Sequence, residues 1–323
     1  MNSQIKSQLE DRASRFIPIV PDLKTVVWAT DFSEQSDAAL RWLLEFAGDR
    51  IANLHIVHAV DSSLAWLSES NECVGNVIRN NLVSIGDKIT NQCISVQTNY
   101  SVGKPWDIVA RIASRTSADL IVVGAHGHST MVGRILGATA NRLIRATFTP
   151  VLVHRQNHQG LTHGIRTIVC AYDFSQESAR AIGSALSFFR DQRKPQRLVL
   201  LHALPIPVMY VDVNVPIPSP EYWNDIEADA RHKLSEFASQ LLGEGLELAT
   251  KVVRDDPADA ILQEAYSSQA DLITIGTVGR TGVNRFLMGS VAERVLHYAT
   301  CSVLTVHRAN EGVSHTCGCG DAT

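Results

Sequence analysis

The chain has 323 residues, of which 45% are hydrophobic, and this length suffices for two ordinary domains because single hydrophobic cores stop growing well before it. Its 29 basic and 33 acidic side chains give a net charge of −4, so neither a nucleic acid nor an anionic membrane is expected as a partner. The first 22 residues are polar, and no later stretch approaches the ~20 apolar residues of a membrane span, which indicates an unsecreted, cytoplasmic protein.

An internal repeat begins with the first predicted strand. Residues 26–33 read Val-Val-Trp-Ala-Thr-Asp-Phe-Ser and residues 168–175 read Ile-Val-Cys-Ala-Tyr-Asp-Phe-Ser, an offset of 142. In each half, apolar residues then follow at i, i+3, i+4 and i+7, which predicts a helix with one apolar stripe after the turn. The stripe residues are Leu40, Leu43, Leu44 and Ala47 in the first half and Ile182, Ala185, Leu186 and Phe189 in the second.

The later elements recur in the same order in both halves. A strand that ends in His-Ala is predicted at residues 56–59 and 200–203. A short helical pattern that opens with proline, a residue tolerated at helix starts, follows Pro105 and Pro257. Almost uninterrupted apolar runs, which indicate strands covered on both faces, lie at residues 120–123 and 272–275. The last strands, through which we expect the halves to meet, lie at residues 151–154 and 303–306.

The offset grows to 152 later in the repeat, so the second half contains an insertion. It lies between His202 and Asp271, where residues 204–220 hold five prolines and predict a long irregular loop. The apolar segment 208–211 of this loop suits a cover for a ligand or a contact with a partner, and packing on the protein's own surface is an equal alternative. The polar stretch 155–166 is the predicted linker, which divides the chain into domains 24–155 and 166–307.

The alternation of short apolar runs with helical patterns is typical of parallel βαβ units. We therefore predict an α/β fold in which each half is a five-stranded, mostly parallel sheet with four helices on its two faces. In a doubly wound sheet, ligands bind beyond the carboxyl ends of the strands, where the strand order reverses. Residues that end a strand are the first candidates for a site.

The fourth strand of the second half ends in a glycine pattern. Gly276 and Gly279 are followed after nine residues by Gly289 and Ser290, which open the helical pattern of residues 291–296. Glycines let a ligand approach the backbone, and a Gly-Ser at a helix start offers free N–H groups, a hydroxyl and the positive end of the helix dipole. These features predict a phosphate-binding site. A turn followed by a helix start explains one or two of the glycines but not the whole spacing.

This spacing resembles the nucleotide-binding signature of the ATP-binding branch of the universal stress protein family. The Asp-Phe-Ser turn, the His-Ala strand end and the Ala-Asp-Leu strand also occur in the family's order in both halves, so the chain resembles a tandem member. The resemblance implies two flavodoxin-like (Rossmann-like) domains and an ATP ligand, alone or with Mg²⁺. The residues that it places at the nucleotide are Ala171, Asp173, Ala203, Gly276, Gly279, Arg280, Gly289, Ser290 and Val291.

Two of these assignments have good structural alternatives. Asp173 with Gln176, like Asp31 with Glu34, forms a pattern that also predicts a cap for the helix that follows. We weight the cap and the ligand contact equally. Arg280 would reach a phosphate, but an arginine in a loop is more often simply solvated.

The first half departs from the family's pattern after its third glycine. Ala138 stands where Ser290 stands in the second half, so one hydroxyl contact worth roughly 1 kcal/mol is lost while the backbone donor is kept. Thr139 would supply a hydroxyl if the helix began one residue later. The resemblance therefore implies a weaker nucleotide site made of Asp31, Ala59, Gly124, Gly127, Gly137, Ala138 and Thr139.

Other groups of polar residues predict neither a metal site nor a catalytic one. Six cysteines in a chain of this size favour reduced thiols over a disulfide framework. His126 and His128 lack a recognised metal-ligand spacing. The terminal His315, Cys317 and Cys319 would suit a soft metal ion, but a glycine-rich terminus is more often disordered.

The sequence thus favours a nucleotide-binding regulatory protein of the stress response that is not a rapid enzyme. Its glycine pattern has neither the Gly-Lys-Ser/Thr lysine nor an obvious carboxylate pair for Mg²⁺, which phosphoryl transfer normally uses. A slow ATPase, and a nucleotide-independent scaffold that binds protein partners or another small ligand, are the alternatives. We expect an adenine nucleotide as the partner and an intramolecular pseudo-dimer of the two halves, alone or within a homodimer.

Overall fold

The computed structural model describes residues 23–61, 72–89, 94–127, 136–156, 165–188, 197–205, 220–241, 246–277 and 288–307. The elements of the first half are β1 (Thr25–Ala29), α2 (Glu34–Ala47), β2 (Asn53–Val60), α4 (Glu72–Lys88), β3 (Ser95–Val102), α5 (Pro105–Arg115), β4 (Leu120–Gly124), α6 (Ala138–Ala146) and β5 (Val151–His154). Those of the second half are β6 (Thr167–Ala171), α7 (Gln176–Phe188), β7 (Arg197–Leu204), α8 (Pro220–Leu241), β8 (Glu247–Arg254), α9 (Pro257–Ser267), β9 (Leu272–Gly276), α10 (Ser290–Tyr298) and β10 (Ser302–Val306). Most of the predicted linker and proline-rich loop lies outside the described residues.

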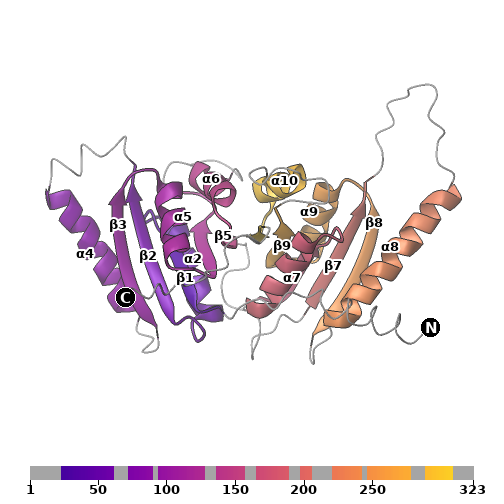
Figure 1. Ribbon diagram of the computed structural model, residues 1–323, viewed down its shortest axis with the longest axis horizontal. Helices are drawn as coiled ribbons and strands as arrows, with labels where there is room; N and C mark the ends of the chain where they lie inside the picture. The colour runs from indigo at the N-terminus through magenta and orange to yellow at the C-terminus, as the bar shows by residue number, and fades with distance from the viewer. Residues whose placement is uncertain are drawn as a thin grey trace, which may run out of the picture.

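The ten strands of the described residues form one sheet, in the order β3-β2-β1-β4-β5-β10-β9-β6-β7-β8 (Figure 1). Neighbouring strands within each half are parallel, and each half follows the order 3-2-1-4-5. The strand order reverses between β1 and β4 and between β6 and β9, which are the places where a doubly wound sheet binds its ligand. The predicted α/β fold with two repeated domains is confirmed.

The two domains meet through β5 and β10, which pair antiparallel at the centre of the sheet. Leu152 lies opposite Leu304, and both side chains are almost fully buried. The pairing expected between residues 151–154 and 303–306 is therefore confirmed. Figure 1 shows α6 and α10 side by side next to this seam, where Arg145 and Glu293 form an ion pair at 2.8 Å.

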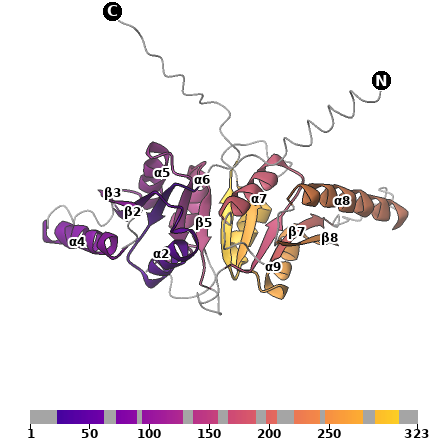
Figure 2. The same ribbon diagram turned by 90° about the horizontal axis from the view of Figure 1, so that it is seen from below.

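The helices form two layers, one on each face of the sheet. Alternate strand residues face opposite layers: Trp28 packs in the core shared by α2, α4, α7 and α8, and Val27 packs in the core shared by α5, α6, α9 and α10. Figure 2 shows α5 and α6 on one side of the first-half strands and α2 on the other. None of the described helices is long and apolar enough to cross a membrane.

The Asp-Phe-Ser turn after the first strand has the same backbone conformation in both domains. Phe32 and Phe174 have positive φ angles of 63° and 64°, which a bulky residue rarely adopts. Their rings contact the rings of His58 and His202, each at 4.3 Å between centroids. Nδ1 of the histidine lies 2.8 Å (first domain) or 2.7 Å (second domain) from the carbonyl oxygen two residues before the phenylalanine. The histidine thus holds the turn in a strained conformation at the end of the strand.

Candidate functional site

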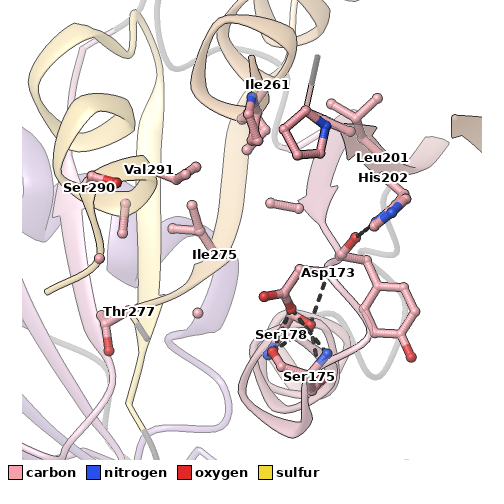
Figure 3. A pocket seen from close by; sticks show the side chains of 18 of the residues that line it. Asp173, Ser175, Ser178, Leu201, His202, Ile261, Ile275, Thr277, Ser290 and Val291 are labelled. Atoms are coloured by element: carbon pink, nitrogen blue, oxygen red, sulfur yellow. Dashed lines mark hydrogen bonds between the residues drawn. The ribbon is translucent and has the colours of Figure 1, made fainter. Parts of the chain in front are cut away.

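A cavity of about 480 Å³ lies at the carboxyl ends of β6, β7 and β9, where the strand order of the second domain reverses. Helices α7, α9 and α10 complete its walls. Ile261 and Ile275 contribute apolar surface, whereas Asp173, Thr277 and Ser290 contribute polar groups (Figure 3). An apolar cavity with a few polar groups is typical of a small-molecule site.

The first turn of α10 leaves free donors at this cavity. The helix begins at Ser290, as predicted, and its N-cap residue Gly289 provides no side-chain cap. The N–H of Gly289 donates to the carbonyl oxygen of Thr277 at 2.7 Å, and the first intrahelical bond runs from the N–H of Glu293 to the carbonyl oxygen of Gly289 at 3.0 Å. The backbone N–H groups between these two bonds have no acceptor within the helix. They belong to Ser290, Val291 and Ala292.

Gly276 is explained by packing within the protein as well as by the cavity that it lines. A Cβ atom on it would lie 3.1 Å from the backbone nitrogen of Ser178, at the start of α7. Gly124 holds the same position in the first domain, where a Cβ atom would lie 3.4 Å from the backbone nitrogen of Ser36. The close contact between strand and helix therefore accounts for Gly276, to which the sequence assigned a role in ligand approach, and the contact is looser at Gly124.

Asp173 forms a hydrogen-bonded turn before α7 but does not cap the helix. Its Oδ1 accepts hydrogen bonds from the N–H of Ser175 at 3.1 Å and from the Ser175 hydroxyl at 2.5 Å. Oγ of Ser175 in turn accepts the N–H of Ser178 at 3.1 Å and caps the helix. The Asp-x-x-Gln cap expected from the sequence is therefore wrong, and so is its counterpart in the first domain, where Ser33 caps α2. An aspartate two residues before the cap instead orients the capping serine.

The carboxylate of Asp173 points into the cavity, opposite Ser290 and Val291 (Figure 3). Asp173 is the one carboxylate among the described lining residues, which include neither lysine nor arginine. Burial, together with the nearby charge of Asp173, raises the pKa of Tyr172 to about 12, so the phenol is neutral at pH 7. The described part of the cavity thus carries free N–H donors on one side and a single carboxylate on the other.

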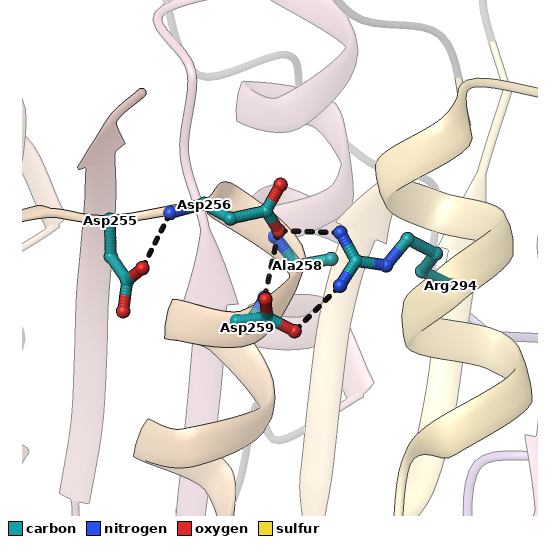
Figure 4. A network of polar contacts seen from close by, with 5 residues as sticks. All are labelled: Asp255, Asp256, Ala258, Asp259 and Arg294. Carbon is teal, nitrogen blue, oxygen red and sulfur yellow. Dashed lines mark hydrogen bonds and ion pairs between the residues drawn. The ribbon is translucent and has the colours of Figure 1, made fainter. Parts of the chain in front are cut away.

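Arg294, on the second turn of α10, holds the start of α9 (Figure 4). Nη1 of its guanidinium donates to Oδ1 of Asp256 at 2.8 Å, and Nη2 donates to Oδ1 of Asp259 at 2.7 Å. Hydrogen bonding to Asp259 and the charges of both aspartates raise the pKa of Arg294. This contact joins two helices that form adjacent walls of the cavity. Lys104 replaces Asp256 at the matching position of the first domain, so one of the two ion pairs of Arg294 has no counterpart there.

Residues 22–70, 85–155 and 164–307 match the model of the universal stress protein family, and these segments make up more than half of the chain. The chain belongs to the universal stress protein family. Its strand order, its repeated Asp-Phe-Ser turn and the glycine-bounded start of α10 are therefore those of a tandem universal stress protein.

Relatives that match over nearly their whole length support the tandem organisation. A universal stress protein of Mycolicibacterium smegmatis is 27% identical over 293 residues, which cover 87% of this chain and 96% of the relative. One of Mycobacterium tuberculosis is 28% identical over 304 residues, which cover 88% of this chain and 96% of the relative. The crystal structure of a universal stress protein from Archaeoglobus fulgidus covers 90% of this chain and 98% of its own, with a TM-score of 0.64 at 19% identity, and supports the fold.

The structure of this universal stress protein brings most of the sequence-predicted residues together. Gly279 and Arg280 lie outside the described residues. The others all line the cavity: Ala171, Asp173, Ala203, Gly276, Gly289, Ser290 and Val291. The other lining residues were not predicted. Among them, Tyr172, Thr277 and Met288 each adjoin a predicted residue in sequence, and Ile261 lies on the buried face of α9.

The start of α10, with Gly289, Ser290 and Val291, is called the cradle below. The first domain of this universal stress protein repeats the backbone of the cradle at the start of α6 but lacks the serine hydroxyl. The N–H of Gly137 donates to the carbonyl oxygen of Ala125 at 2.8 Å, and α6 begins at Ala138. Thr139 is therefore the second residue of the helix and matches Val291, so it does not take the position of Ser290. A side chain on Gly127 would collide with the carboxylate of Asp31, so the backbone after β4 runs against that carboxylate.

Proposed function

We propose that this universal stress protein is an ATP-binding regulatory protein of the stress response and not a rapid enzyme. The observation that carries the proposal is the second-domain cavity, in which the free N–H groups of α10 face the carboxylate of Asp173. A phosphate chain requires hydrogen-bond donors and is stabilised by the positive end of a helix dipole. A ribose hydroxyl requires an acceptor such as a carboxylate. The cavity offers both at opposite sides.

In this proposal the phosphates lie at the start of α10, where the backbone N–H groups of Ser290 and Val291 and the Ser290 hydroxyl donate to them. A Cβ atom on Gly289 would lie 3.4 Å from the carbonyl oxygen of Thr277, a normal contact distance, so protein packing does not require glycine there. In the proposal, the absence of a side chain at Gly289 leaves room in the cavity for the phosphates. Asp173 accepts from the ribose, and apolar residues such as Ala203 contact the base.

Rapid phosphoryl transfer is not proposed, because the described lining contains no lysine and no second carboxylate. One oxygen of the Asp173 carboxylate already accepts two hydrogen bonds from Ser175. Mg²⁺ often binds through one carboxylate, water and the phosphates of a nucleotide. Asp173, which the proposal assigns to the ribose, lies opposite the phosphate end, so no carboxylate of the described lining remains there to hold Mg²⁺. The role that fits this site is a change in conformation or assembly that depends on ATP binding.

Calorimetric titration of nucleotide-free protein with ATP tests the proposal. We expect one tight binding event per chain, which Gly289→Val abolishes and its first-domain counterpart Gly137→Val retains. Valine tolerates the extended backbone of Gly289 (φ −63°, ψ 147°), so this variant should fold. Absence of binding by the wild-type protein would favour the nucleotide-independent scaffold. Phosphate release at about 1 per second or faster, lost in Gly289→Val, would instead favour an enzyme.

A further inference from the structure

Helix α10, which provides the phosphate end of the proposed site, is held from the first domain by two arginines. Nη2 of Arg145, on α6, lies 2.8 Å from Oε1 of Glu293. Nη2 of Arg155, which follows β5, donates to the carbonyl oxygen of Leu296 at 2.6 Å. Glu293 comes three residues after Ser290, and Leu296 is one turn further along. Both contacts therefore act on the two turns of α10 that follow the cavity.

The reciprocal ion pair is missing, although the two domains repeat each other. Asn141 and His297 occupy the positions that match Glu293 and Arg145. An asparagine carries no charge, so α6 cannot receive from His297 the contact that α10 receives from Arg145. Within the described residues, the charged contacts between α6 and α10 run in one direction, from the first domain to the helix of the intact cradle.

Arg155 brings a positive charge to α10, whereas its counterpart brings none to α6. Burial lowers the pKa of its guanidinium, which nevertheless stays charged at pH 7 because the pKa of arginine starts above 12. A buried charge needs compensation, and the Leu296 carbonyl in the last turns of α10 provides part of it, at the end of the helix where a cation also stabilises the dipole. The matching residue of the second domain is His307, which lies against the backbone of Ile144 on α6; burial lowers the pKa of His307 to about 4, so this matching contact carries no charge at pH 7.

We propose that the first domain acts as a positioning domain for the second-domain site, with Arg145 and Arg155 as the residues that hold α10 in place. Neither arginine lines the cavity, so both act through the helix whose first-turn N–H groups converge on the ligand. The inference rests on the proposed function and deepens it, because it gives a role to the domain whose own cradle lacks the serine hydroxyl. Nucleotide affinity in the second domain then depends on side chains of the first.

Titration of the full chain with ATP tests this dependence. We expect Arg145→Gln and Arg155→Met each to raise the dissociation constant about 2- to 30-fold, the range found for coupling through packed elements. His297→Gln, the matched control at the position equivalent to Arg145, should leave it unchanged. Glu293→Gln should reproduce the loss seen with Arg145→Gln, and the double variant should bind no more weakly than either single variant, because both changes remove the same contact.

Amide hydrogen exchange of α10 without ATP gives a second readout. Exchange should be faster in Arg145→Gln than in the wild type and unchanged in His297→Gln. If the wild-type protein binds no ATP, the proposed function fails, while the exchange of α10 still decides the positioning role. Wild-type affinity in both arginine variants, or wild-type exchange where ATP does not bind, overturns the inference. If Arg155→Met does not fold, Arg145→Gln decides alone, because this side chain is 33% exposed and its loss is tolerable.

Discussion

The hydroxyl oxygen of Thr277 lies 2.8 Å from Nδ1 of His307 and joins the wall of the cavity to the residue that follows the last strand. Thr277 is fully buried, and its carbonyl oxygen accepts the N–H of Gly289. His307 also faces α6, where the backbone of Ile144 raises its pKa against the stronger lowering by burial. The cavity, the seam between the domains and a helix of the first domain therefore meet at one buried polar contact.

Two buried histidines, His307 and His154 at the end of β5, predict a loss of stability in mild acid. Burial lowers the pKa of His307 and of His154 to about 4, whereas a histidine of the unfolded chain titrates near 6.5. As the pH falls from about 6.5 to about 4, the unfolded chain binds protons first, so the free energy of unfolding decreases, by on the order of 3 kcal/mol per histidine. Denaturant titrations across this range measure the decrease. His154→Gln should reduce it, and an unchanged pH dependence would contradict the assignment.

The serine of the cradle predicts a difference between the two sites. Ser290→Ala removes a hydroxyl and keeps the backbone donor, so it should weaken ATP binding by about 1 kcal/mol, or about fivefold in the dissociation constant. Ala138→Ser, the reverse change in the first domain, should leave the tight event unchanged. Calorimetry with stoichiometry distinguishes the two sites. If Gly137→Val abolishes the tighter event while Gly289→Val leaves it intact, the assignment of the working site is wrong.

The strained turn before α7 predicts that a glycine variant at position 174 is more stable than an alanine variant. Phe174→Gly and Phe174→Ala both lose the ring contact with His202, but alanine must also adopt a φ of 64°, which costs an L-residue about 1–2 kcal/mol. Phe174→Gly should therefore destabilise the protein less than Phe174→Ala, although glycine is usually the worse of the two. Free energies of unfolding from denaturant titration give the order. A more stable alanine variant would show that the turn is not strained.

The seam predicts the behaviour of an isolated second domain. Without β5, strand β10 presents an unpaired edge and exposes the surroundings of Leu304, which is fully buried in the intact chain. Residues 160–323 alone should therefore form dimers or aggregates, as light scattering after size-exclusion chromatography would reveal. A well-behaved wild-type monomer would count against the seam as a required contact.

Apolar periodicity predicted the fold well because it reports burial directly. The stripe that contains Leu40 and Leu43 packs in the core, and the strands at residues 120–123 and 272–275 are buried as expected. The start of α10 was also predictable, because a glycine followed by serine at a change of periodicity marks a helix start. These features depend on local sequence alone.

Hydrogen-bonded details were less predictable because several residues of the same turn can make the same bond. Asp173 and Ser175 are both good capping residues, and the choice depends on a helix start that periodicity locates only within one or two residues. The packing of Gly276 against α7, and the contact between Thr277 and His307, join segments that meet only when the sheet has formed. No local pattern in the chain reports such contacts.

Covalent joining of the two domains changes what their seam permits. A two-fold dimer of identical single domains would carry every substitution twice, so its two cradles and its two sets of interface side chains would have to be the same. Here β5 and β10 make the corresponding antiparallel contact between strands of different sequence. One cradle can therefore keep Ser290 while the other has Ala138, and Arg145 can face Glu293 without a second arginine at position 297. The fused chain therefore allows its two domains to take different roles, which two identical subunits of a symmetric dimer cannot do.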